Sequence, residues 1–125
     1  MRIYSESGSI LGEANLVDGN GVYKEYYLNT MQLQLTSQMK NGVRDGVTNW
    51  YYKNGQLKER KNFKEGKKDG LDRDFYENGQ LSSKGNYKNG GIKDGLWEKY
   101  TESGPFWSKK CYQNGKEVDI SYCED

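Results

Sequence analysis

The sequence DGVTNWYYKNGQLKERKNFKEGKKDG, residues 45–70, decides the fold because it is one complete module that begins and ends with Asp-Gly. Asn54-Gly55 stands at its centre, between WYYK and QLKE. Asn-Gly is the strongest short-range signal for a two-residue β-turn, in which both residues adopt a positive φ. The stretch therefore predicts a strand, a tight turn and a second strand, followed by a connector rich in Gly and Lys.

The module recurs along the chain with a period of about 24 residues, which predicts a repeat architecture. The copies span residues 3–21, 22–46, 47–70, 71–95 and 96–119, and residues 120–123 are expected to form a short closing strand. The turn position is held in successive copies by Gly8, Thr30, Gly55, Gly79 and Gly104. We therefore predict a single all-β domain over residues 1–125, an elongated, twisted antiparallel sheet of about five stacked β-hairpins.

The apolar positions of each copy are predicted to share one face of this sheet. Each copy holds two runs of about six residues, which is the length of a strand. Side chains alternate between faces along a strand, so Val47, Asn49 and Tyr51 share one face. We expect Leu57 and Phe63 of the second strand to lie on that face too, because this places all the apolar columns of the repeat together.

The opposite face is predicted to carry aromatic and basic residues that the repeat does not require. They are Tyr27, Trp50, Tyr52, Lys58, Arg60, Tyr76, Lys84, Trp97, Trp107 and Lys109. Trp, Tyr and Arg are enriched at protein interfaces, so we interpret this set as a protein-binding surface. Two alternatives stay open: the rings cover one another as a minor core, or they stack on single-stranded nucleic acid. Glu25, Asp72 and Asp74 on the same predicted face argue against nucleic acid.

The residue types give no support to catalysis or to a metal site. The chain has no His, the commonest general base and metal ligand. Asp72 and Asp74 share a strand face and are expected to be solvated charges, and Cys111 has no His to activate it. Cys111 and Cys123 are either free thiols or a disulfide that ties the tail to the last strand. We expect no catalytic residue, no metal and no cofactor.

Charge and hydropathy narrow the partners and the location. The formal net charge is +1, so no chain-wide field attracts nucleic acid or anionic lipid. No apolar run is long enough for a membrane-spanning helix or a secretory segment. We therefore expect a cytoplasmic protein without membrane insertion, whose oligomeric state the sequence leaves open.

The repeat resembles the bacterial variant of the MORN repeat. The resemblance rests on DGVTNWYYKNGQLKERKNFKEGKKDG, DGLDRDFYENGQLSSKGNYKNGGIKDG and DGLWEKYTESGPFWSKKCYQNGK, and weakens before residue 42. It implies an elongated sheet of stacked hairpins and carries no catalytic residue with it. Bacterial members are often described as antitoxin-like, which implies a protein as the partner.

Together these observations predict a non-enzymatic, bacterial or phage-derived protein that binds and covers another protein. The expected partner is a toxin, a nuclease or another defence effector. The alternative is a structural scaffold or envelope-associated repeat protein, and a single-stranded nucleic-acid binder comes third.

The turn assignment makes a separate expectation about stability. Val in place of Gly55 or Gly79 is expected to cost about 1 to 2 kcal/mol, because it would be forced to a positive φ. The substitution Thr30→Gly is expected to be neutral or mildly stabilising.

Overall fold

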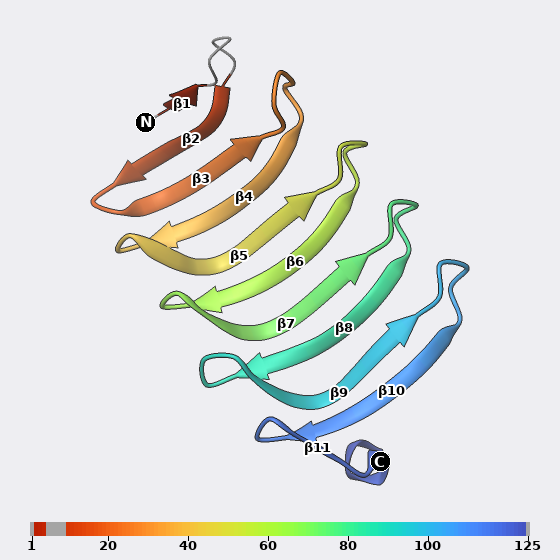
Figure 1. The fold of residues 1–125 in the computed structure, drawn as a ribbon. Helices are drawn as coiled ribbons and strands as arrows, with labels where there is room; N and C mark the ends of the chain where they lie inside the picture. Colours follow the sequence, from red (N-terminus) through yellow and green to blue (C-terminus); the bar gives the residue numbers. More distant parts are fainter. Residues whose placement is uncertain (1, 5–9, 125) are drawn as a thin grey trace.

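The structure is a computed structural model that describes residues 2–4 and 10–124, without the side chains of Ile10, Phe106 and Trp107. The described residues form one open antiparallel sheet of eleven strands, each paired with its neighbours in sequence (Figure 1). The elements are β1 (Arg2–Tyr4), β2 (Ile10–Val17), β3 (Asn20–Tyr26), β4 (Leu33–Lys40), β5 (Val43–Tyr51), β6 (Leu57–Lys64), β7 (Lys67–Phe75), β8 (Leu81–Lys88), β9 (Ile92–Tyr100), β10 (Phe106–Gln113), β11 (Lys116–Val118) and the 3-10 helix η1 (Ile120–Cys123). The predicted elongated sheet of stacked hairpins is confirmed, and the chain ends lie at opposite ends of it (Figure 1).

Two kinds of turn alternate along the sheet. The first kind is a two-residue turn in which both residues have a positive φ. Asn41 (φ 52) and Gly42 (φ 80) form such a turn between β4 and β5. Glu65 (φ 52) and Gly66 (φ 84) form the same turn between β6 and β7. These are type I′ turns, whose twist matches that of the strands they join. The Gly and Lys-rich segments predicted as connectors are thus the tight two-residue hairpins.

The turn at Asn54-Gly55 has three residues, so the prediction of a two-residue turn there is wrong. Gly55 has a φ of 91, whereas Asn54 does not adopt a positive φ. The N–H of Tyr52 donates to the carbonyl of Gln56 (2.9 Å) and the N–H of Gly55 donates to the carbonyl of Tyr52 (3.0 Å). The Asn54 side chain caps this turn, since its Oδ1 accepts from the Gln56 N–H at 2.9 Å. The first predicted turn, at Gly8, lies outside the described residues.

A β-bulge follows this turn and reverses the alternation of side chains along the second strand. Tyr51 lies opposite Leu57, whereas Trp50 lies opposite Glu59, so Lys58 is an additional residue. Beyond the bulge Phe63 is paired with Gly46 and therefore faces away from Val47. One additional residue moves every later side chain of a strand to the other face.

The prediction that all apolar columns share one face is therefore wrong in half of its positions. Leu57 and its equivalents do lie beside the aromatic residue that ends the first strand, as expected. The later column lies on the opposite face, where its members pair with glycines: Met39 with Gly21, Phe63 with Gly46, Tyr87 with Gly70 and Tyr112 with Gly95.

We call the face that carries Ser37, Thr48 and Asp72 the inner face, because these side chains are 1%, 0% and 5% exposed. We call the other face, which carries Val47 and Asn49, the outer face. Ser37 is paired with Thr48, and their hydroxyl oxygens lie 2.7 Å apart. The two most buried of these side chains, Ser37 and Thr48, are thus polar and satisfy one another, and Leu35 on the same face is 4% exposed.

A disulfide fixes the C-terminal end. Cys111 of β10 and Cys123 of η1 are joined, with Cα atoms 5.8 Å apart, so the free-thiol alternative is wrong. Residues 120–123 form η1 in place of the predicted closing strand, and β11 closes the sheet instead. Asp119 caps η1, because its Oδ1 accepts from the Ser121 N–H at 3.0 Å, and this bond lowers the pKa of Asp119. Among the described residues there is no helix of the length and hydropathy needed to cross a membrane.

Gly79 of a three-residue turn and Thr30 of the four-residue turn between β3 and β4 give a test of this geometry. Gly79 has a φ of 90, so Gly79→Val should lower the free energy of unfolding by about 1 to 2 kcal/mol. Thr30 has no positive φ, and its Oγ1 donates to the Tyr27 carbonyl (2.9 Å) and accepts from the Gln32 N–H (3.1 Å). Thr30→Gly should therefore cost about 1 to 2 kcal/mol too, contrary to the expectation from sequence. An unchanged urea midpoint for Thr30→Gly would show that these bonds do not hold the turn.

The disulfide gives a second test. It closes a loop of 12 residues, so Cys123→Ser should lower the free energy of unfolding by about 2 to 3 kcal/mol without reductant. Tyr122→Ser is the matched control, because Tyr122 is 68% exposed and its loss should change stability by less than about 0.5 kcal/mol. Equal urea midpoints for the two variants would show that the disulfide does not contribute to stability.

Candidate functional site

The ten residues predicted to form one binding face lie in three different places. Trp50 and Trp97 belong to the inner face, and Arg60, Lys84 and Lys109 belong to the outer face. The remaining described members lie at the three-residue turns and their bulges: Tyr27, Tyr52, Lys58 and Tyr76. The side chain of Trp107 lies outside the description. The prediction that these residues share one continuous face is therefore wrong, because the bulge separates them. Contact of any of them with a partner stays a prediction.

The tyrosines beside the turns tie each repeat to the next. The Tyr52 hydroxyl donates to the backbone carbonyl of Phe75 (2.7 Å), and the Tyr76 hydroxyl donates to that of Tyr100 (2.6 Å). Tyr27 makes the same bond to the copy that follows it. These three hydroxyls are used inside the protein, so their recurrence has a structural reason.

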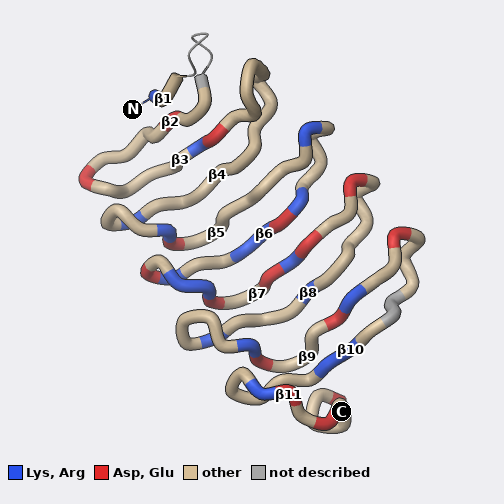
Figure 2. The backbone as a smooth tube through the Cα atoms, in the orientation of Figure 1, with Lys and Arg blue, Asp and Glu red and all other residues tan. Residues whose placement is uncertain are grey.

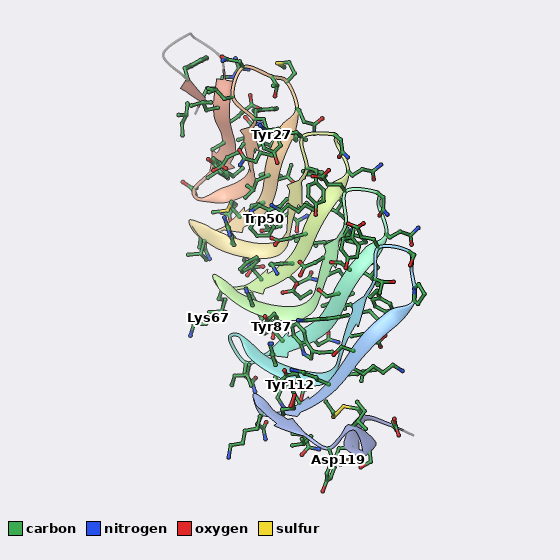
Figure 3. The ribbon with its side chains drawn as sticks, turned by 45° about the vertical axis from the view of Figure 1, so that its right-hand side comes forward. Tyr27, Trp50, Lys67, Tyr87, Tyr112 and Asp119 are labelled. Carbon is green, nitrogen blue, oxygen red and sulfur yellow. A yellow bond between two sulfur atoms is a disulfide. The ribbon has the colours of Figure 1, made fainter. Side chains whose placement is uncertain are left out.

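The inner face is closed by cations that lie over aromatic rings. The Arg44 guanidinium lies 5.4 Å from the centre of the Trp50 ring and 5.5 Å from that of Phe63. One copy later the Lys68 ammonium lies 5.0 Å from the centre of the Tyr87 ring. Such contacts are attractive because the ring face is electron-rich. Trp50 therefore takes part in the internal packing of the inner face, where Tyr87 also lies (Figure 3).

The Trp97 ring occupies the space that a side chain at position 85 would fill, and residue 85 is a glycine. A Cβ at Gly85 would overlap the Trp97 ring, so only Gly leaves room for it. Trp97 packs edge-on against Tyr87, with ring centres 5.0 Å apart, and the Lys93 ammonium lies 4.7 Å from the Trp97 ring centre. The sequence signal for this arrangement is Gly85 itself, a Gly in the middle of a strand that marks a close approach.

A cavity of about 240 Å³ lies beside Trp97 on the inner face. Asp74, Lys99 and Lys110 contribute to its walls. The indole Nε1 of Trp97 and one oxygen of Asp74 are buried there without a hydrogen-bond partner. Its walls carry charges of both signs, so the cavity selects no single class of ligand.

The inner face also holds a nearly buried ion pair. The Lys61 ammonium lies 2.7 Å from a carboxylate oxygen of Asp72, and the two side chains are 15% and 6% exposed. Asp72 is therefore not the solvated charge that the sequence predicts. Burial opposes the charge of Lys61, but the hydrogen bond and negative charge of Asp72 outweigh it and raise the pKa of Lys61.

The outer face carries a row of three cations on neighbouring strands. Arg60 of β6 lies directly opposite Arg73 of β7, and Arg73 lies directly opposite Lys84 of β8. Figure 2 shows that β6, β7 and β8 each carry basic residues, drawn in blue. The side chain of none of the three has an ion pair or hydrogen bond with another described residue. We call Arg60, Arg73 and Lys84 the basic row.

Carboxylates near the basic row are occupied elsewhere. Glu98 lies opposite Lys84 at the end of the row, but its carboxylate accepts a hydrogen bond from Tyr100. That bond raises the pKa of Tyr100 to about 12. Reasoning from sequence found Arg60 and Lys84 but assigned Arg73 to the structural face, and only the strand register brings the three together. The sequence feature that could have identified Arg73 is the variability of its position in the repeat. Successive copies carry Lys24, Asn49, Arg73 and Glu98 there.

The described residues contain no group of three His, Cys, Asp or Glu side chains that could hold a metal ion. Cys111, the nucleophile considered from sequence, is bound in the disulfide.

Comparison with known proteins identifies the repeat in the middle of the chain. Residues 44–65 and 68–89 match the family model described as the MORN repeat variant. Each match begins at the cation that covers an inner-face ring, Arg44 or Lys68, and ends at the first residue of a turn, Glu65 or Asn89. This family is a repeat module without known catalytic activity. No curated protein and no solved structure gives a significant match to the chain.

The ion pair of the inner face can be tested by single and double substitution. Lys61→Met should lower the free energy of unfolding by about 2 to 3 kcal/mol, because it leaves the Asp72 charge buried alone. The double variant Lys61→Met/Asp72→Leu should recover most of that loss. Lys110→Met is the control, since the Lys110–Glu117 pair is 55% and 51% exposed and should contribute less than about 0.5 kcal/mol. A double variant no more stable than Lys61→Met would show that the pair is not the reason for the loss.

Proposed function

We propose that this chain is a non-enzymatic protein-binding module that engages its partner through the outer face. MORN repeats are commonly protein-binding, and two of them match here. The observation that carries the proposal is the basic row, three adjacent cations whose side chains pair with no other described residue. By contrast, Lys61 and Asp72 on the inner face and the tyrosine hydroxyls at the turns are engaged within the protein.

We further propose that binding is inhibitory, as an antitoxin, an immunity protein or a phage anti-defence protein in the cytoplasm. An open sheet presents a broad, rigid surface without a deep cleft, which suits covering another protein rather than holding a small substrate. A toxin or nuclease whose active surface is rich in carboxylates would match the charge of the basic row. The antitoxin-like description of bacterial members supports this role.

A structural scaffold is the second candidate, and the N-terminal edge of the sheet favours it. β1 is the end strand of the sheet, so its outer edge pairs with no other described strand, and Ile3 and Tyr4 in it are 43% and 54% exposed. An unpaired strand edge is a template for pairing with another chain. Binding of single-stranded nucleic acid ranks third, because the rings of Trp50 and Trp97 are packed on the inner face, away from the basic row.

Affinity purification from the native host tests the proposal. The tagged chain should retrieve one protein in a 1:1 ratio, measured by quantitative mass spectrometry after purification at about 0.15 M salt. A variant with Arg60→Gln and Lys84→Gln should retrieve much less of it, whereas Lys64→Gln, at the far end of β6, should not differ from the wild type. Recovery of only further copies of the chain would favour the scaffold. Absence of any stoichiometric partner would contradict protein binding.

A further inference from the structure

We infer that the basic row recognises a cluster of carboxylates on an acidic segment of the partner protein. This inference rests on the proposed protein-binding function and specifies the chemistry of the surface that it binds. Its first support is that like charges directly opposite one another across two strands are destabilising. Neighbouring strands lie about 4.8 Å apart, so Arg60, Arg73 and Lys84 form a close line of positive charge.

The same two strands show that the chain places counter-charges where it uses them for stability. On the inner face of β6 and β7, Lys61 is opposite Asp72 and the two are ion-paired at 2.7 Å. On the outer face, Arg60, the residue before Lys61, is opposite Arg73, the residue after Asp72. The formal net charge of the chain is only +1, so the row is not the product of a general excess of basic residues. The positive charge is concentrated at these three positions, and the one carboxylate directly opposite the row, Glu98 across from Lys84, accepts a hydrogen bond from Tyr100.

Two buried polar atoms in and beside the row lack partners, and they define the occupant further. The Nε of Arg73 and the Oδ1 of Asn49 have no hydrogen bond, and Asn49 lies directly opposite Arg60. A carboxylate binds the guanidinium fork of an Arg through two parallel bonds. The Asn49 oxygen requires an N–H donor, which a peptide backbone supplies and a phosphate group does not. A protein segment with acidic side chains offers carboxylates to the guanidinium groups of the row and backbone N–H donors to the amides beside it.

The surface around the row suits a protein contact. Next to the cations, the outer face alternates aliphatic side chains with amides, as in Val47 opposite Asn62 and Leu71 opposite Asn86. Leu71 is 37% exposed, so apolar area is available beside the charges. An interface of this kind combines charge complementarity with a small apolar contact.

The test uses hexaglutamate as the probe, with hexaglutamine and the oligonucleotide dT6 for comparison. Binding is followed by ¹⁵N NMR at the Nε–H of Arg73, and thermal unfolding is measured for each variant. Arg73→Glu is the informative variant and Lys64→Glu is its control, because both change the net charge equally. Lys64 lies on the same face as Arg60 by strand alternation, but at the far end of β6, away from the row.

We expect hexaglutamate to shift the Arg73 Nε–H signal and to bind more tightly than hexaglutamine and dT6. Arg73→Glu should weaken binding at least about tenfold, and Lys64→Glu less than about threefold. Arg73→Glu should at the same time raise Tm by about 1 to 4 °C, because it places a carboxylate between two cations. Higher stability with lost binding distinguishes a binding role from a structural one.

Three results would overturn the inference: an unshifted Arg73 Nε–H signal, equal losses for the two variants, or tighter binding of dT6 than of hexaglutamate. Its failure is distinguishable from that of the proposed function. A native partner bound equally by wild type and Arg73→Glu would leave protein binding intact and refute the acidic contact. Hexaglutamate binding as expected, with no stoichiometric partner from the host, would support the chemistry of the row and refute the proposed function.

Discussion

The structure depends on one constraint: a single-layer sheet has no second layer against which to bury its side chains. The inner face meets this constraint by covering itself. Arg44 lies over the rings of Trp50 and Phe63, and Lys61 and Asp72 form a nearly buried pair. Basic side chains supply long apolar stems as well as charge, so they can close a face that has too few aliphatic residues. This accounts for a folded chain in which hydrophobic residues make up only 33% of the sequence.

The turns meet the same constraint by linking each repeat to the next. The Tyr52 hydroxyl donates to a carbonyl of the following copy, and the Asn54 amide donates to the Glu77 carbonyl at 3.1 Å. Asn78 repeats this bond one copy later. The Asn-Gly sequence is thus required for two reasons, since Gly supplies the positive φ and Asn supplies both the cap of its own turn and the link to its neighbour. The outer face contributes no comparable bond through the basic row, which leaves that face available to a partner.

The period of the sequence was sufficient to predict the all-β repeat sheet, because turn glycines and aromatic columns recur whatever the register. Periodicity alone could not assign side chains to faces. Lys58 is one additional residue at a bulge, so each later side chain of that strand points to the opposite face from the one predicted. For the candidate site, Arg60 and Lys84 were singled out from the sequence, and their contact with a partner stays a prediction. Arg73 was missed because only the strand register shows that it lies between Arg60 and Lys84. Trp97 was assigned to a binding surface, whereas its ring packs into the space left by Gly85.

Our central claim is that the turn links and the inner face hold the sheet, while the basic row does not. Urea unfolding of two matched double variants tests this claim directly. Tyr52→Phe/Tyr76→Phe removes two links between repeats, and Arg60→Thr/Lys84→Thr removes two cations of the row. We predict that the first loses about 2 to 4 kcal/mol of stability and that the second is at least as stable as the wild type. Equal losses in both variants would contradict the claim and assign the basic row to the fold.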